Sequence, residues 1–360
     1  MTTADDRRRR FRLLLGGIEP VDRALRNVRR TDQVVALQGQ VEALRAELEA
    51  ATKELERLRA VRAVEAADRD HEVPPWSDEP ASVERFLSLF PPGHFYSPVP
   101  DLAEVDRDAD RLFASRRSLT GVDLREEAQV ALFGELAALS RADPLPAGPE
   151  GGTRYWTDNP FYGIGDASML QAMLRHLRPK RYLEVGSGWS TALALDTSER
   201  FLDGTVSVTA IEPYPAVLRD RLRPGDRVDV IEAPVQSVPL ERFEALEAND
   251  VLFIDSSHVL KAASDVHFLT TAVLPVLAPG VVVHLHDMFW PFEYLRHWIE
   301  QGRAWNECYL VHAFLLYNDA FEVVLFNHFL AQCRPEVIEA ELPAMAENPG
   351  GALWLRRWRP

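Results

Sequence analysis

The sequence predicts an α/β protein with a doubly wound sheet of seven strands. Two observations carry this prediction. From residue 166 onward, short runs rich in β-branched and apolar residues alternate with segments of helical periodicity, a pattern typical of parallel sheets flanked by helices. A glycine-rich turn also follows the first of these runs, where such folds bind ligands. The 360 residues, 46% apolar, are enough for a substantial core.

The expected elements follow in order along the chain. Strands are predicted at 181–185, 206–211, 228–231, 251–254, 281–285, 321–326 and 352–355. Helices are predicted at 82–90, 124–140, 166–177, 190–200, 240–246, 262–277, 292–301 and 307–316. The run at 251–254 is entirely apolar, which is typical of a strand buried in a parallel sheet.

The N-terminal part has a different character. Residues 1–30 contain nine arginines against four acidic residues, so 1–31 is expected to be a basic docking segment or a solvated terminus. Apolar residues then repeat at alternating spacings of four and three over 32–64, which predicts a coiled coil and a homo-oligomer. The alternative is an amphipathic helix folded back on its own domain. Prolines mark 65–80 as a linker, 81–152 is expected to be a cap of short helices and loops, and 153–360 the α/β domain that binds the ligand.

Composition excludes several function classes. The net charge of −15 gives no electrostatic reason to expect nucleic-acid binding. No apolar run approaches the roughly 18–20 residues of a membrane span, and no signal peptide is expected. Cys308 and Cys333 lack metal-binding spacing, which favours a reducing, cytoplasmic setting. The basic segment would allow at most peripheral contact with anionic lipid.

The turn after the first strand carries the first chemical signal. The strand contains Glu184 and leads into Gly186 and Gly188, which open a helix. A dinucleotide fingerprint needs a third glycine, but Thr191 occupies that position. A carboxylate here would repel a pyrophosphate and suit a cationic ligand, such as the aminoacyl end of S-adenosylmethionine.

Polar residues also end the later strands. Glu212 follows the second strand, at the position that binds ribose hydroxyls in nucleotide folds. Asp255, His258, His286 and Asp287 follow the fourth and fifth strands and should meet at one edge. Such groups act in general acid–base catalysis or bind a divalent ion. Alternation places His284 and His286 on one face of the fifth strand, and Lys261 is expected one helical turn beyond His258.

These segments resemble the class I S-adenosylmethionine-dependent methyltransferases, which have a Rossmann-like fold. More narrowly, they resemble a bacterial group found among surface-polysaccharide biosynthesis genes. The matching segments are 95–101, 158–162, 165–167, 183–191, 211–215, 253–258, 284–294 and 302–307. The resemblance covers about residues 90–330.

The resemblance implies roles for individual residues. Those expected to bind S-adenosylmethionine are Glu184, Gly186, Ser187, Gly188, Trp189, Ser190, Glu212, Pro213, Tyr214, Gln236, Asp255 and Ser256. Asp255 and Asp287 match positions that bind magnesium in related sugar O-methyltransferases. His286 stands where some relatives have another acid, so base catalysis is the alternative to a metal.

The predicted reaction is methyl transfer to the hydroxyl of a sugar or polysaccharide. His258 or His286 would be the base, Asp287 its orienter or a metal ligand, and Lys261 would reach the same cleft. Aromatic residues at 95–96, 156, 161–162 and 289–294 are expected around the acceptor. Two alternatives remain: an oxygenase with iron on His258, His286 and Asp287, and a non-catalytic oligomeric scaffold.

Overall fold

The computed structural model describes residues 89–149 and 151–359. All of them belong to one compact unit, residues 74–360. The predicted basic segment, coiled coil and linker, and most of the helix expected at 82–90, lie outside the described residues.

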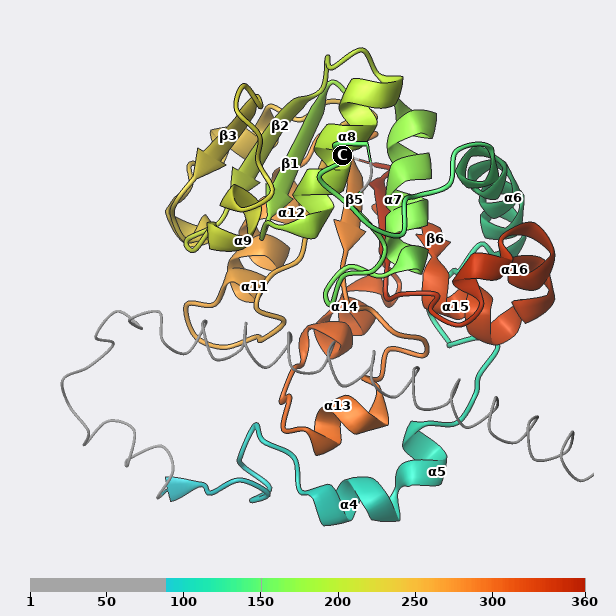
Figure 1. Ribbon diagram of the computed structural model, residues 1–360. Coiled ribbons are helices and arrows are strands. Elements are labelled where there is room, and N and C mark those ends of the chain that lie inside the picture. Colours follow the sequence, from blue (N-terminus) through green and yellow to red (C-terminus); the bar gives the residue numbers. More distant parts are fainter. Residues whose placement is uncertain (1–88, 150, 360) are drawn as a thin grey trace, which may run out of the picture. The chain divides into compact units, whose positions relative to one another are not determined.

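Seven strands form one mixed sheet in the order β3-β2-β1-β4-β5-β7-β6 (Figure 1). Their bounds are β1 Arg181–Val185, β2 Ser207–Ile211, β3 Val228–Ile231, β4 Val251–Ile254, β5 Val282–Leu285, β6 Phe321–Phe326 and β7 Leu353–Arg357. The first five pair in parallel, whereas β7 runs antiparallel to both β5 and β6. The chain reverses its winding between β1 and β4, so the predicted doubly wound sheet of seven strands is confirmed.

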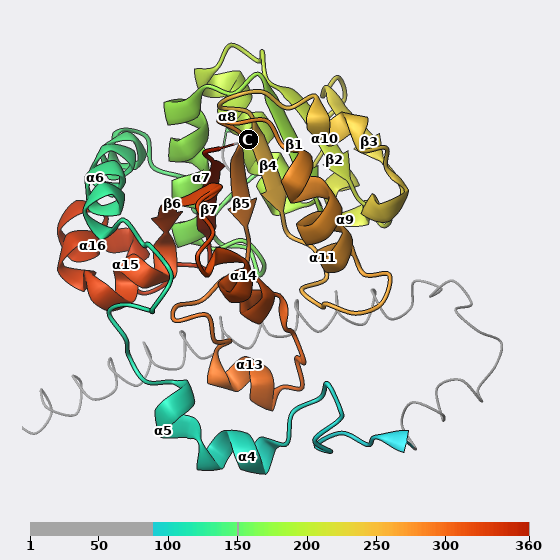
Figure 2. The same cartoon turned by 180° about the vertical axis from the view of Figure 1, so that it is seen from behind.

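Helices cover both faces of the sheet. Helices α7 and α8 lie on one face and α10 and α11 on the other (Figure 2). The bounds are α4 Leu102–Arg107, α5 Ala109–Leu112, α6 Glu126–Ala142, α7 Ile164–Leu177, α8 Trp189–Phe201, α9 Ala216–Arg219, α10 Glu241–Glu244, α11 Asp265–Phe268, α12 Leu274–Val276, α13 Arg296–Glu300, α14 Glu307–Leu315, α15 Asn327–Cys333 and α16 Pro335–Glu341. None of these helices is long and apolar enough to cross a membrane.

Two predicted helices are wrong in extent. The helix expected at 262–277 begins only at Asp265 and contains a π-helical stretch, Leu269–Val273, before α12. Pro275 lacks the N–H that a regular α-helix would use there, so the hydrogen-bond register shifts. The helix expected at 292–301 is reduced to α13, because Phe292 has a φ of 67° and Leu295, with a ψ of 132°, has an extended backbone.

The core lies on both sides of β4 and β5, whose residues are all buried. Helices α15 and α16 were not predicted; they pack beside α6 at the β6 edge, a tertiary arrangement that local periodicity does not reveal. Cys308 and Cys333 are both free and buried. The carboxyl ends of the parallel strands point toward α13 and α14 (Figure 1), and that edge carries the polar residues singled out above.

Candidate active site

The glycine turn after β1 packs directly against the loop after β4. Gly186 has a φ of +92°, and a Cβ at this position would lie 2.1 Å from the backbone oxygen of Asp255. Only glycine fits both the backbone conformation and the space. The turn and the loop that carries Asp255 therefore form a single surface.

Glu184 supports this turn from inside. Its carboxylate is fully buried and accepts hydrogen bonds from the hydroxyls of Ser190 and Thr191, the latter at 2.6 Å. Thr191 in turn accepts from the backbone N–H of Gly188 at 3.2 Å. Burial raises the pKa of Glu184 to about 8. Glu184 thus holds the first turn of α8, and its direct contact with a ligand stays a prediction.

Two buried hydroxyls flank the turn without a hydrogen-bond partner among the described residues. They are the Oγ atoms of Ser187, between the two glycines, and of Ser256, next to Asp255. Buried polar atoms are nearly always paired in native structures. Two orphaned hydroxyls beside a glycine turn are what a site for a polar ligand provides, so the residues present fit the expected cofactor.

The other predicted cofactor residues lie on neighbouring elements. The carboxylate of Glu212, directly after β2, accepts from the backbone N–H of Tyr214 at 2.8 Å. Pro213 and the Tyr214 side chain are exposed. Gln236 is exposed and its amide donates to the carbonyl of Ala263 at 2.8 Å, which joins the loop after β3 to the loop after β4.

Trp189 instead belongs to an aromatic cluster. Its ring centroid lies 4.6 Å from that of Trp156 in an edge-to-face contact, and Arg221 stacks 4.7 Å above it. The geometry accounts for Trp189 through packing at the start of α8.

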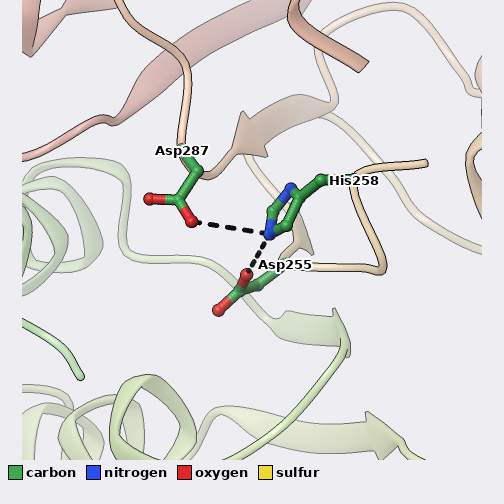
Figure 3. Close-up of side chains that lie close together, drawn as sticks. All are labelled: Asp255, His258 and Asp287. Carbon is green, nitrogen blue, oxygen red and sulfur yellow. Dashed lines mark ion pairs between the residues drawn. The ribbon is translucent and has the colours of Figure 1, made fainter. Parts of the chain in front are cut away.

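The centre of the site is a triad of titratable side chains, Asp255, His258 and Asp287 (Figure 3). Nε2 of His258 lies 3.3 Å from Asp255 Oδ1 and 3.5 Å from Asp287 Oδ2. One ligand atom from each residue falls within 4.8 Å of the others. The histidine is buried and both carboxylates are half-buried. Of the four residues predicted to meet at this edge, Asp255, His258 and Asp287 form one cluster, and His286 adjoins it through Asp287.

The triad is strongly polarised. Burial would raise the pKa of Asp255, yet His286 and His258 lower it to about 2. Burial also opposes charge on His258, but its bonds to Asp255 and Glu307 and the charge of Asp287 raise its pKa well above the usual value. The neighbouring carboxylates therefore favour the protonated form of His258, whereas a cation bound between them would favour the neutral form. Two carboxylates and an imidazole converging on one point fit a divalent cation equally well.

His284 and His286 share one face, as predicted, and His286 adjoins the triad through Asp287. His284 stacks on Phe253 with ring centroids 4.0 Å apart, and its Nε2 lies 3.4 Å from Nδ1 of His286. Burial lowers the pKa of His284 well below its usual value. His286 lies beside Tyr162, and its Nε2 is 3.7 Å from Asp287 Oδ1. Within the described ranges, His258, His286 and Asp287 do not form the cluster that the alternative iron centre needs.

Lys261 is not where the sequence predicted it. Residues 255–264 contain no helix, because His258 and Ala263 have φ values of 59° and 63°. Lys261 is exposed, and its backbone N–H donates to Ser264 Oγ at 3.1 Å. The reasoning that it lies one helical turn beyond His258 is therefore wrong.

Two site residues were missed. Glu307, the first residue of α14, is buried with Oε2 2.9 Å from His258 Nδ1. Asp166, in the first turn of α7, is buried beside His286, and burial raises its pKa to about 6. Both are acids at helix starts, which is too common a signal to single out a functional residue.

The predicted aromatic lining divides into three groups. Phe95 and Tyr96 are exposed, whereas Tyr162 and Phe289 are buried in the core. Trp290 and Tyr294 do line a cavity of about 570 Å³ between α5 and the loop after β5. Its wall also contains Asp110, Phe113, Ser115, Glu293, Arg296, His328 and Gln332.

Comparisons with known proteins agree with this architecture. Residues 183–288, from β1 to just beyond Asp287, match the family described as "Methyltransferase domain". An uncharacterised protein of Archaeoglobus fulgidus is 36% identical over 177 residues, which are 47% of this chain and 79% of that protein.

Two solved structures are similar at low identity. The SAH-bound methyltransferase PaMTH1 of Podospora anserina is 18% identical with a TM-score of 0.37, over 68% of this chain and 99% of that one. The O-methyltransferase TomG of Streptomyces achromogenes, in complex with SAM, is 15% identical with a TM-score of 0.36. The similarity covers 71% of this chain and 96% of that one. The assignment to methyltransferases follows from the matched domain at residues 183–288. That domain makes this protein a methyltransferase, of the kind that takes its methyl group from S-adenosylmethionine.

Proposed function

We propose that this enzyme is an O-methyltransferase that acts on a hydroxyl group of a sugar or polysaccharide. The observation that carries the proposal is the triad of Asp255, His258 and Asp287, which lies at the strand edge directly beside the glycine turn. A hydroxyl placed there would have a proton acceptor within reach and the cofactor surface next to it.

S-adenosylmethionine would bind across the glycine turn and the end of β2. Ser187 and Ser256 offer unpaired hydroxyls, and Glu212 offers a carboxylate at the ribose position. The cofactor supplies an electrophilic methyl group. The protein's part is to align the acceptor oxygen with that group and to remove the hydroxyl proton, and alignment alone contributes up to roughly 7–11 kcal/mol.

His258 is our candidate for the base, in the neutral form that a divalent ion bound to Asp255 and Asp287 would favour. Its Nε2 is the one ring nitrogen in the triad that faces both carboxylates, whereas His286 is buried against Tyr162 and His284. Asp255 and Asp287 would hold a divalent ion such as Mg²⁺. Such an ion would supply positive charge that lowers the pKa of the acceptor hydroxyl.

The acceptor class is inferred from the cavity between α5 and the loop after β5. Its volume of about 570 Å³ is in the range of small-molecule sites. The wall combines aromatic faces, Phe113, Trp290 and Tyr294, with hydrogen-bonding side chains such as Asp110 and Gln332. Aromatic faces suit the apolar side of a sugar ring, and the polar groups suit its hydroxyls. Trp290 lies three residues after Asp287 in the same loop, so this loop would connect the cavity to the triad.

The decisive experiment is calorimetric titration with S-adenosylmethionine and S-adenosylhomocysteine, with and without Mg²⁺. We expect micromolar binding by the wild type and binding about 10–100-fold weaker in Glu212→Ala, because a charged hydrogen-bond acceptor is lost. Glu232→Ala is the matched control, since Glu232 directly follows the neighbouring strand β3 and pairs with Arg219 on the surface.

Absence of binding in the wild type under both conditions would overturn the proposed cofactor site. If binding is seen, transfer of a labelled methyl group to a panel of methyl glycosides tests the acceptor class. Transfer to a nitrogen or carboxylate acceptor in place of the sugar hydroxyls would contradict that part of the proposal.

A further inference from the structure

We propose that Glu307 is a positioning residue that sets the orientation of the His258 ring, so that Nε2 faces the reacting hydroxyl. The inference rests on the proposed function of His258. The contact that carries it is the 2.9 Å distance from Glu307 Oε2 to Nδ1 of His258. Nδ1 lies across the ring from Nε2, the nitrogen that faces Asp255 and Asp287.

The backbone around this contact is held as firmly as the side chains. The backbone N–H groups of Asn306 and Glu307 both donate to the carbonyl of His258, at 3.0 and 3.1 Å. The side-chain amide of Asn306 forms two hydrogen bonds with the backbone of Leu260. Its oxygen accepts from the Leu260 N–H at 2.5 Å, and its nitrogen donates to the Leu260 carbonyl at 3.3 Å. Hydrogen bonds therefore join the start of α14 to residues 258–260, although Glu307 lies 49 residues after His258 in the sequence.

The packing also prevents the ring from turning over. Trp305 covers one face of the imidazole, with ring centroids 4.4 Å apart. A flipped ring would leave the Glu307 carboxylate, which is 3% exposed, buried without its partner. Leaving one partner of a buried charged pair alone is strongly unfavourable.

The chemistry follows from the two nitrogens of imidazole. When Nδ1–H donates to a carboxylate, the other nitrogen, Nε2, is the one that can accept a proton or bind a metal. Glu307 therefore keeps the proton of the neutral ring on Nδ1 and leaves Nε2 free to accept a proton from the hydroxyl. Residues in this role typically alter activity or metal affinity by about 10–100-fold when they are replaced.

The experiment compares wild type, Glu307→Gln, His258→Gln and the double variant. Nuclear magnetic resonance of protein labelled with ¹⁵N in its histidines reports the proton on Nδ1 of His258, and His258→Gln assigns that signal by its loss. We expect a low-field, slowly exchanging Nδ1 proton in wild type that moves upfield or exchanges away in Glu307→Gln. The Kd for S-adenosylhomocysteine should stay within about twofold of the wild-type value, because Glu307 contacts the His258 ring on the side away from Asp255 and Asp287.

Turnover is measured with the acceptor found in the methyl glycoside panel. We expect Glu307→Gln to lower kcat about 10–100-fold and to leave the KM for S-adenosylmethionine unchanged within about twofold. In the His258→Gln background the same replacement should have no further effect, because Glu307 acts through that ring. Asp250→Asn is the control: this acid is also buried, but it binds the backbone of Lys180 and Arg181 at the opposite edge of the sheet.

Three outcomes would overturn the inference: no proton on Nδ1 of wild-type His258, kcat of Glu307→Gln within about twofold of wild type, or an equal loss in both backgrounds. The resonance in the wild type decides the contact even if a variant fails to fold. A failure of the proposed function looks different, since the wild type would then transfer no methyl group while the Nδ1 proton is still observed.

Discussion

At the scale of single residues, the site depends on a few positions where the backbone conformation or the available space restricts the residue type. Gly186 is the clearest case, because a methyl group there would overlap the backbone oxygen of Asp255 rather than a side chain that could move. His258 is another: its φ of 59° turns the chain so that the ring points back between Asp255 and Asp287. Such strained backbone positions cluster at functional sites.

Gly186→Ala should therefore reduce both stability and cofactor binding. We expect a loss of at least about 1–3 kcal/mol in the free energy of unfolding, from the positive φ and the displaced loop. Denaturant unfolding and calorimetry with S-adenosylhomocysteine measure the two effects. Gly204→Ala is the matched control, because Gly204 also has a positive φ, +65°, but no atom lies within 4 Å of the added methyl group. Equal losses of binding in the two variants would show that the contact with Asp255 is unimportant.

At the scale of elements, buried charge fixes the segment that precedes α7. The side chain of Arg154 is 1% exposed and forms ion pairs with Asp196 and Glu199 of α8 and with Asp226 before β3. Asp196 also accepts from the backbone N–H groups of Arg154 and Tyr155 at 2.7 and 2.9 Å. The aromatic segment 155–162 is thereby tied to the helix that begins at the glycine turn.

Arg154→Met should cost about 3–5 kcal/mol in the free energy of unfolding, because it leaves buried carboxylates without their partner. Urea denaturation of the full chain measures this loss. The same change at Arg219, whose pair with Glu232 lies on the surface, should cost less than about 1 kcal/mol. A loss of that small size at Arg154 would contradict the structural role given to the network.

At the scale of the whole molecule, we propose that the heptad pattern at 32–64, which lies outside the described residues, joins copies of the chain into a homo-oligomer. Replacing Leu44 and Leu48 together by glutamate places charge in the predicted apolar seam and should reduce the oligomer to monomers. Light scattering coupled to size-exclusion chromatography measures the mass of both forms. An unchanged mass would mean that this seam does not hold the subunits together.

Much of the sheet could be predicted because its information is local. The runs at 181–185, 228–231, 251–254 and 321–326 match β1, β3, β4 and β6 residue for residue. The meeting of Asp255, His258 and Asp287 also followed from the sequence, since parallel strands end at one edge. The pairing of His258 with Glu307 did not, because no periodicity links a loop residue to the start of a helix 49 residues further on. Lys261 was misplaced for a related reason. Positive φ values at His258 and Ala263 prevent the expected helix, and histidine and alanine are not residue types that predict a positive φ.

The place of β7 has a consequence for how the protein is made. This strand is the last in sequence, yet it lies between β5 and β6, and Gly351 just before it accepts a hydrogen bond from the N–H of Met288, next to Asp287. During synthesis on the ribosome, β5 and β6 must wait with open edges until residues 353–357 emerge. The hydrogen bond from Met288 to Gly351 can form only when β7 lies in place beside β5, so the backbone next to Asp287 depends on the insertion of that strand.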